Sequence, residues 1–364
     1  MSINAFVKNK NCLLENTRSN NFNIIRFVAA FMVIYGHMSS IMGLPAQTIL
    51  AQRVSTIGVK SIFVISGYLI TKSCMSDDHY GRFLFRRCIR IFPPLILMVL
   101  VVVFIMGPVF TVLPFREYFH NYGTRYYFRN ILLYPIYSLP GVFADCPYPN
   151  VVNGSLWTLP VEFALYLVLP IIITLFKKFG ALKQGIAVTA ILSLGGSIAR
   201  VVFFPDVRLV FYGTNWPDAL SLLPYYFMGA LFSLFDMKKY LNIQIGILLI
   251  SIASFCTTNQ ALNELAVGLA LPYFILSVGL IQEPLFSSFF EKADFSYGIY
   301  LYGFPVQQVL YQIIHPFFPS CGVLTMSVVS FGISLCFAVL SWFLLERHIQ
   351  KLSKVVLLRW TKKK

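Results

Sequence analysis

The chain has 364 residues, of which 57% are hydrophobic and 12% are charged, and its formal net charge is +15 at pH 7. Apolar stretches of about twenty residues recur along its whole length, which excludes a soluble globular domain and indicates a membrane protein with several spans. The positive charge lies mainly in alternate loops, so nucleic-acid binding is an unnecessary explanation for it.

Ten apolar segments are long enough to cross a bilayer, and we predict an all-α, polytopic helical bundle with both termini in the cytoplasm. In chain order the predicted spans are 22–42, 54–74, 91–111, 156–176, 184–204, 217–235, 240–257, 263–281, 295–314 and 322–345. Of the 29 Lys and Arg residues, 21 fall on the side of the N-terminus and 5 in the loops on the other side. The positive-inside rule therefore places the N-terminus in the cytoplasm.

The predicted spans divide the chain into a cytoplasmic segment over 1–21, a transmembrane domain over 22–345 and a basic cytoplasmic tail over 346–364. The first apolar run is too long for a signal peptide, so we expect it to remain as an anchor. The seven cysteines have no metal-ligand spacing, and no metal site is predicted. Cys146 and Cys321 both fall in outward loops, where the sequence fits either a disulfide or two ordinary buried thiols.

The first span contains two ionisable residues, Arg26 and His37, eleven positions apart. At about 100° per residue, the two side chains point in directions that differ by only roughly 20° around the helix, and they lie about 16 Å apart along its axis. A charge in hydrocarbon costs roughly 2.5–3.5 kcal/mol, so such residues indicate a functional site. The plainer interpretation is that His37 only hydrogen-bonds a neighbouring helix.

Small polar residues interrupt the second span at Ser66 and Gly67, near the middle of the membrane. Such residues let a ligand or another helix approach the backbone closely, and either use fits this pair.

An arginine cluster precedes the third span and comprises Arg82, Arg86, Arg87 and Arg90. If this segment is helical, Arg82, Arg86 and Arg90 share four-residue spacing, and Arg87 stands beside Arg90 at i, i+3. Guanidinium groups in that arrangement form a phosphate site. Alternatively, the cluster only fixes the topology and contacts anionic lipid.

The longest outward segment, from about 112 to 155, is rich in Tyr, Phe and Pro. Its apolar stretch 130–137 is too short to span the membrane and is expected at the outer surface. It serves either as a cap over a substrate or as an interfacial helix that fills space.

Distances to the ends of the spans place His37 and Glu162 roughly 8 and 9 Å below the outer surface, and Lys60 and Arg200 at comparable depths. We therefore predict a polar cluster of these four residues in the outer half of the membrane. Ser155, Glu162 and Tyr166 share one face of the fourth span, which should meet His37. An imidazole beside a carboxylate is suited to general-base catalysis.

Taken in order, these segments resemble the membrane-bound acyltransferase family 3, the integral-membrane O-acyltransferases that decorate bacterial surface glycans. The likeness covers nearly the whole chain. The matching residues are Arg26 and His37 of an Arg-x10-His pattern, Phe63, Ser66 and Gly67 of Phe-x-x-Ser-Gly, Arg87 and Arg90 of Arg-x-x-Arg, Ser155 to Glu162 with Thr158 in place of a second Ser, and Ser296, Tyr297, Tyr300, Leu301 and Pro305 of a late Ser-Tyr-x-x-Tyr-Leu-x-x-x-Pro pattern.

The chain departs from the family pattern at several positions. Asn23 stands where many relatives have Asp, and Gly303 stands where many have a second His. The chain also ends soon after its tenth predicted span, without the esterase-like domain of some relatives, so a direct transfer by one protein is expected.

The resemblance implies an O-acetyltransferase of the bacterial inner membrane that uses acetyl-CoA from the cytoplasm. Its donor-binding residues would be Arg86, Arg87, Arg90, Ser66 and Gly67, and its catalytic residues Arg26, His37 and Glu162. His37, oriented by Glu162, would deprotonate a hydroxyl of a surface or lipid-linked polysaccharide, or carry the acyl group transiently. The acceptor sugar and the choice between acetyl and another short acyl group stay open.

A second interpretation is a transporter for polysaccharide or a lipid-linked glycan, in which Arg26, His37 and Glu162 line a translocation path. No pseudo-symmetric halves support it. A third interpretation is a structural or regulatory membrane subunit. It does not explain why Arg26 and His37 lie on the same face of the first span.

Overall fold

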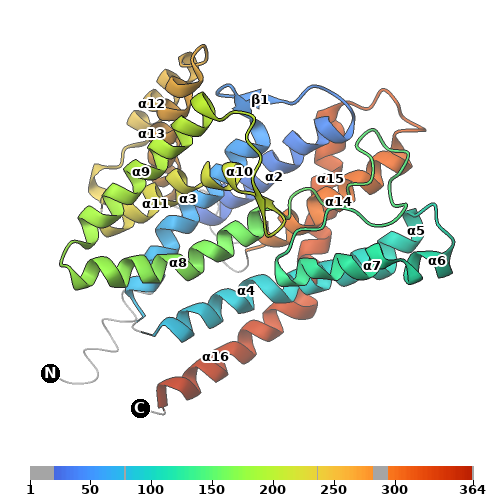
Figure 1. Ribbon diagram of the computed structural model, residues 1–364, viewed down its shortest axis with the longest axis horizontal. Coiled ribbons are helices and arrows are strands. Elements are labelled where there is room, and N and C mark those ends of the chain that lie inside the picture. The colour runs from blue at the N-terminus through green and yellow to red at the C-terminus, as the bar shows by residue number, and fades with distance from the viewer. Residues whose placement is uncertain (1–19, 78, 236, 282–293, 363–364) are drawn as a thin grey trace.

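A computed structural model describes residues 20–77, 79–235, 237–281 and 294–362 of the chain. These residues form a bundle of helices with two short β-hairpins, which confirms the predicted all-α class (Figure 1). Asparagine side chains cap the N-termini of two of the helices. The Asn259 side chain accepts from the backbone N–H of Leu262, and Asn242 caps another helix in the same way.

Within the described residues, seven helices are long and apolar enough to cross a membrane. They are α2 (Phe22–Ile41), α3 (Val54–Met75), α4 (Tyr80–Val101) with η1 (Val102–Met106) and α5 (Gly107–Phe110), α8 (Thr158–Lys178), α9 (Leu182–Phe203), α13 (Gln260–Gly279), and α15 (Val323–Ser341) with η4 (Trp342–Glu346) and α16 (Arg347–Lys362). The chain is therefore a multi-pass helical membrane protein.

Three predicted spans contain helices outside that set. They are α11 (Leu223–Leu234), α12 (Ile243–Phe255) and α14 (Ser296–Ile314). At 1.5 Å per residue, the 12 residues of α11 and the 13 of α12 rise only about 18 and 20 Å, less than the ~30 Å hydrocarbon core. Helix α14 has 19 residues but includes polar side chains, and its Gln307 and Gln308 are fully buried.

Short elements connect the helices. They are the hairpin β1 (Thr48–Ile49) with β2 (Gln52–Arg53), the helices α6 (Phe115–His120) and α7 (Tyr122–Tyr126), the 3-10 turn η2 (Tyr127–Leu132), the hairpin β3 (Val210–Phe211) with β4 (Thr214–Asn215), α10 (Trp216–Leu220) and the 3-10 turn η3 (Met237–Tyr240).

Helix α3 lies at the centre of the bundle, packed on α2 and α11. Two glycines make the contact with α11 close. A Cβ at Gly67 would collide with the backbone oxygen of Tyr226, and one at Gly229 would collide with that of Val64. Because apolar side chains gain little by leaving lipid, such close backbone contact is what holds membrane helices together.

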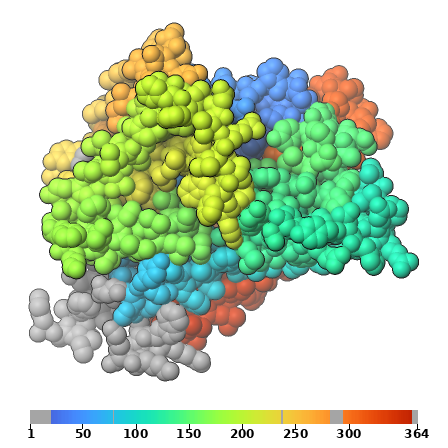
Figure 2. All heavy atoms as spheres, in the orientation of Figure 1, coloured from blue at the N-terminus to red at the C-terminus, as the bar shows by residue number. Residues whose placement is uncertain are grey.

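The outward segment folds back along α4 and η1. The Tyr118 hydroxyl donates to the Val103 carbonyl at 3.0 Å, and the Phe104 ring lies 6.0 Å from the rings of Phe119 and Phe128. In Figure 2 this teal and green segment lies beside the yellow β3–β4 hairpin, to which the hydrogen bond from the Tyr137 hydroxyl to the Gly213 carbonyl joins it.

Two long helices continue beyond the predicted span boundaries. The arginine cluster is part of α4 itself, so the helical form on which its predicted spacing depends is present. Helix α16, which covers most of the predicted tail 346–364, continues from α15 through η4 and packs against α4 (Figure 1). Cys146 and Cys321 are both free thiols.

Candidate active site

Two neighbouring chambers lie inside the bundle between α2, α3, α4, α8 and α14. The first, about 190 Å³, is the arginine chamber, lined by Arg26, Ser66, Leu69, Ile70, Arg87, Arg90, Glu162 and Tyr166. The second, about 50 Å³, is the tyrosine chamber, lined by Arg26, Val59, Ile62, Phe63, Ser66, Arg90, Ile91, Thr158, Leu159, Glu162, Tyr166, Ser296, Tyr297 and Tyr300. Five residues line both chambers, so the two lie side by side.

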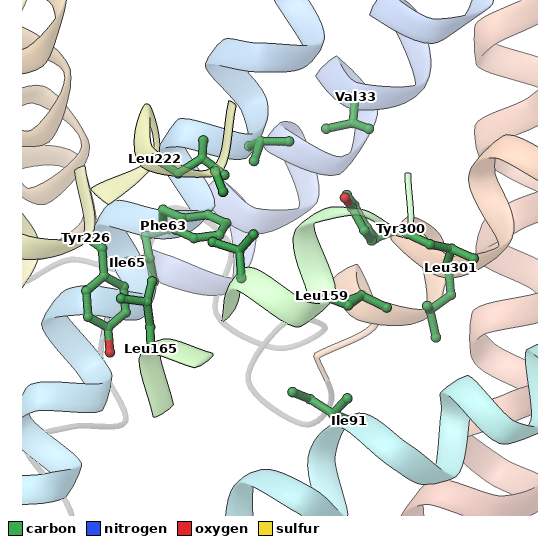
Figure 3. Close-up of a cluster of buried hydrophobic side chains, with 14 of the residues drawn as sticks. Val33, Phe63, Ile65, Ile91, Leu159, Leu165, Leu222, Tyr226, Tyr300 and Leu301 are labelled. Atoms are coloured by element: carbon green, nitrogen blue, oxygen red, sulfur yellow. The ribbon is translucent and has the colours of Figure 1, made fainter. Parts of the chain in front are cut away.

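The walls of the tyrosine chamber are mostly apolar and come from separate helices. Figure 3 shows Phe63 of α3, Ile91 of α4, Leu159 of α8 and Tyr300 of α14 among the buried side chains of this region. Because the walls come from four helices whose residues span 237 positions of the sequence, from Phe63 to Tyr300, the chamber exists only in the folded bundle.

Helical periodicity divides the arginine cluster between two faces of α4. Arg82 and Arg86, four residues apart, both contact the Asp77 carboxylate, at 2.8 and 2.6 Å. Arg87 and Arg90, three residues apart, face the arginine chamber. The structure thus places Arg86, one of the predicted donor-binding residues, with Asp77 and outside the two chambers.

Arg26 and Arg90 meet at one carboxylate. Arg26 Nη1 donates to Asp294 Oδ2 at 3.1 Å, and Arg90 Nη2 donates to the same oxygen at 2.7 Å. Burial by itself raises the pKa of the Asp294 carboxyl, but the two guanidinium groups outweigh burial and lower that pKa to about 2. Asp294 is therefore an anion at any physiological pH.

Arg87 keeps unused hydrogen-bonding capacity. Its Nη2 donates to the Ser73 hydroxyl at 3.3 Å, whereas its buried Nε has no hydrogen-bond partner among the described residues. A buried donor without a partner is costly, about 1–3 kcal/mol, unless a ligand or water receives it. This end of the chamber is therefore suited to an anion.

Glu162 lies where the two chambers join. The Ser66 hydroxyl donates to Glu162 Oε1 at 3.4 Å, and the Tyr166 hydroxyl, one helical turn along α8, donates to the same oxygen. At the far end of the tyrosine chamber, the Tyr300 hydroxyl donates to the Ser155 carbonyl at 2.7 Å. Hydroxyl groups therefore line the path from the arginines to Tyr300.

His37 lies beyond that path, nearer the other end of α2. Its ring makes an edge-to-face contact with Phe304, with 5.3 Å between centroids. Phe304 follows Tyr300 by one turn of α14, so His37 is about one turn beyond the tyrosine chamber. No hydrogen bond among the described residues joins His37 to Glu162.

The predicted cluster of His37, Glu162, Lys60 and Arg200 is divided by the structure. Lys60 pairs with Glu264 at 3.1 Å, and Arg200 pairs with Asp218 at 2.6 Å. Glu162 lines both chambers together with Arg26, and the helical rise separates Arg26 from His37 by about 16 Å along α2. Counting residues from span ends estimates depth alone, whereas the partners of a side chain also depend on how each helix is rotated and tilted.

Ser66 and Gly67 have different surroundings although they are adjacent. Ser66 lines both chambers, whereas Gly67 faces α11 and lets the two backbones touch. The structure thus favours the helix-packing interpretation for Gly67 and keeps Ser66 in the cavity.

Sequence reasoning missed Asp294. One signal was available, because Asp294 directly precedes the Ser-Tyr pattern of Ser296 and Tyr297 at the start of a predicted span. The chain has Asn23 where many relatives have Asp, and the carboxylate that contacts Arg26 in this structure is that of Asp294. No group of three or more His, Cys, Asp or Glu side chains converges within the described part of the chain.

Comparison with known proteins bears on this site. A family model described as an acyltransferase domain matches residues 19–347. The chain belongs to acyltransferase family 3. This acyltransferase is 28% identical over 345 residues to a protein of Shigella phage Sf6 named O-acetyl transferase, covering 91% of this chain and 96% of the relative.

The acyltransferase is also similar to Nodulation protein 10 of Rhizobium leguminosarum bv. viciae, with 26% identity over 358 residues that cover 92% of this chain and 94% of the relative. No solved structure matches the chain. Membership of the family confirms the resemblance drawn from the motifs and decides between enzyme and transporter in favour of an enzyme.

Proposed function

We propose that this acyltransferase transfers an acetyl group from cytoplasmic acetyl-CoA to a hydroxyl of a surface or lipid-linked polysaccharide, at the outer side of the bacterial inner membrane. The main support is the pair of chambers, in which a cationic chamber adjoins a small, mostly apolar one. Acetyl-CoA matches this arrangement, because its nucleotide end carries negatively charged phosphates and its other end carries a short acyl group.

The donor's phosphates bind Arg87, Arg90 and Arg26 in this proposal. These three guanidinium groups and the carboxylates of Asp294 and Glu162 leave the arginine chamber with one net positive charge. Arginine is well suited to phosphate because its planar fork donates two parallel hydrogen bonds. Arg86 is the least favoured of the predicted donor residues, because Asp77 already holds it.

The acyl group then lies in the tyrosine chamber. Its volume of about 50 Å³ and its walls of Val59, Ile62, Phe63 and Leu159 favour a short acyl group over a long one. The name of the phage relative, O-acetyl transferase, supports acetyl and transfer to oxygen.

His37 takes the proton of the acceptor hydroxyl in this proposal. The hydroxyl oxygen forms a bond to the thioester carbonyl carbon, the carbon–sulfur bond breaks, and the proton passes from the imidazole to the departing thiolate to give CoA. Glu162, with Ser66 and Tyr166, orders the junction through which the thioester reaches this point.

A variant of this route has His37 attack the thioester and carry the acetyl group before the sugar hydroxyl receives it. Incubation of the purified enzyme with radiolabelled acetyl-CoA and no acceptor distinguishes the two. Label on wild-type protein that is missing from His37→Ala indicates the acyl-histidine, and unlabelled protein indicates direct transfer.

The proposed topology has ten crossings and both termini in the cytoplasm. The excess of Lys and Arg in alternate loops supports it, and α11, α12 and α14 would supply the three crossings beyond the seven long helices. Attachment of a cysteine-reactive, membrane-impermeant label at single engineered cysteines in each loop tests this arrangement.

The function is tested by mass spectrometry of surface polysaccharide from a deletion strain and from the same strain complemented with wild-type protein or His37→Ala. We expect one acetyl mass per modified sugar with wild type and none with His37→Ala. The exposed His120, changed to Ala, is the control and should restore acetylation. Full acetylation by His37→Ala would refute the proposed role of this residue.

A further inference from the structure

Two positively charged side chains converge inside the arginine chamber. Arg26 and Arg90 come from different helices, α2 and α4, and both reach one oxygen of Asp294. Two like charges that contact the same oxygen repel each other. Without an anion between them, the guanidinium groups would move apart or bind water separately.

Asp294 is itself held in place by the start of α14. Its other oxygen, Oδ1, accepts from the backbone N–H of Ser296 at 3.2 Å and from the Ser296 hydroxyl at 2.5 Å. One carboxylate oxygen is thus used for anchoring to α14 and the other for the two arginines. Through Asp294, the positions of the Arg26 and Arg90 side chains therefore depend on the first turn of α14.

The carboxylate leaves most of each arginine available. Each guanidinium gives one N–H to Asp294, and neither makes another hydrogen bond among the described residues. A guanidinium has five N–H donors, so four remain on each for a ligand. Asp294 therefore holds the two guanidinium groups and leaves most of their N–H donors available. A carboxylate that competed with the donor for these groups would instead occupy the N–H donors that face the chamber.

We propose that Asp294 is a positioning residue that holds Arg26 and Arg90 in the geometry that receives the phosphates of the donor. This inference rests on the proposed function, because it takes the arginine chamber to be the donor site. Asp294 acts through the two arginines and needs no contact with the donor.

The chain contains a matched control. Asp77 also bridges two arginines of α4, Arg82 and Arg86, at similar distances, but none of these three lines either chamber. Asp77→Asn therefore makes the same chemical change to an ion-pair bridge next to the same helix. It should leave donor binding unchanged.

The test uses full-length protein in lipid nanodiscs and measures equilibrium binding of CoA and of S-acetyl-pantetheine, a donor fragment that lacks the nucleotide phosphates. We expect Asp294→Asn to raise the dissociation constant for CoA at least tenfold and that for the fragment less than twofold. Asp77→Asn should change neither by more than twofold. A general structural defect would weaken both ligands alike, which is why the fragment is included.

Three outcomes overturn the inference. Equal or tighter CoA binding by Asp294→Asn would mean that the carboxylate competes with the donor or has no influence on it, and equal weakening of both ligands would mean a structural role alone. If wild-type protein binds no CoA, the proposed donor site fails together with the inference, and this result is distinct from the other two.

A second variant keeps the test informative if Asp294→Asn does not fold. Ser296→Ala removes the hydroxyl that anchors Asp294 while every charge remains. We expect it to weaken CoA binding by about threefold and to leave the fragment unaffected. Unchanged CoA affinity in a folded Ser296→Ala protein would contradict the proposed anchoring.

Discussion

Two ionic groups lie within this bundle and differ in what surrounds them. In the first, Lys60 Nζ contacts both oxygens of Glu264, and Gln52 at 2.8 Å completes its hydrogen bonding. Ser197 donates to the Glu264 carboxylate at 2.8 Å. In the second, Arg26, Arg87 and Arg90 line a cavity and Arg87 Nε lacks a partner among the described residues.

The comparison separates structural charge from functional charge. Both groups join ionisable side chains of different helices, so the presence of charge inside the bundle does not by itself distinguish them. What distinguishes them is whether their hydrogen-bonding groups have partners. The donors and acceptors of the Lys60 group bond to other protein groups, whereas Arg87 Nε of the arginine group has no partner among the described residues. Substitutions in the first should therefore affect folding, and substitutions in the second should affect catalysis.

The largest effect is expected for the two ionisable residues of α2. His37→Ala removes the proposed general base and should lower acetyl transfer by about a thousandfold or more. Arg26→Ala removes a proposed phosphate ligand and should also abolish measurable transfer, and both proteins should stay inserted and folded. Transfer of label from acetyl-CoA in nanodiscs measures the activity, and gel filtration measures the fold. Residual activity above a tenth of wild type in either variant would contradict the assignment.

The Lys60 group should respond in the opposite way. Glu264→Ala leaves the buried Lys60 ammonium without its partner and should lower the free energy of unfolding by about 3–5 kcal/mol. Thermal unfolding in detergent measures this loss. The exposed Glu117, changed to Ala, is the control and should shift stability by less than about 0.5 kcal/mol. An unchanged melting temperature in Glu264→Ala would remove the contrast between the two groups.

The two faces of α4 provide a sharper test within one helix. Arg90→Ala should lower kcat/KM for acetyl-CoA by about a hundredfold, since it removes charge-assisted hydrogen bonds worth about 1.5–3 kcal/mol each. Arg82→Ala removes the same side chain from the face held by Asp77 and should change kcat/KM by less than threefold. Equal losses in both would mean that total charge matters and the chamber does not.

Tyr166 tests the junction between the chambers with a smaller change. Tyr166→Phe removes the hydroxyl that donates to Glu162 and should lower kcat by about tenfold. Tyr127→Phe removes a buried hydroxyl that has no hydrogen-bond partner in the described structure, so its activity should match wild type. A kcat for Tyr166→Phe within twofold of wild type would exclude a role for this hydroxyl.

The smallest effect concerns pH. The pKa of Asp294 is about 2, below its ordinary value, so its charge stabilises the fold above roughly pH 4, the unfolded value, and this contribution is lost as the pH falls through 2. The difference in unfolding free energy between wild type and Asp294→Asn should stay constant from pH 8 to 5 and decrease below about 4. Denaturant titrations at pH 7, 5 and 3 measure it, and a decrease beginning at pH 6 would contradict the strong ion pairing of Asp294.

The sequence predicted features that repeat along a single helix. Arg87 and Arg90 were expected to lie together because three residues make nearly one turn, and the structure places both in the arginine chamber. The prediction for Arg87 and Arg90 agrees with the structure because the α-helical period is fixed by backbone hydrogen bonding and does not depend on neighbouring elements. Arg26 and Ser66, which lie on different helices and which the family resemblance placed at a donor path, both line the cavity.

Relations between helices were beyond the sequence. Glu162 was expected beside His37 and lies beside Arg26, because tilt and rotation of α8 against α2 are set by side-chain packing. The contact of Asp294 with Arg26 joins residues 268 positions apart, which no local pattern encodes.

By itself, then, the sequence determined the helical membrane class and the residues that share a helical face, since these depend on local composition and period. The order of its motifs indicated the family through resemblance to known members. Only the tertiary structure decided which faces meet, that Asp294 joins two arginines, and that Lys60 pairs with Glu264 away from the cavity. The physical reason is that packing between helices depends on contacts distant in the chain, and one sequence read along its length does not contain them.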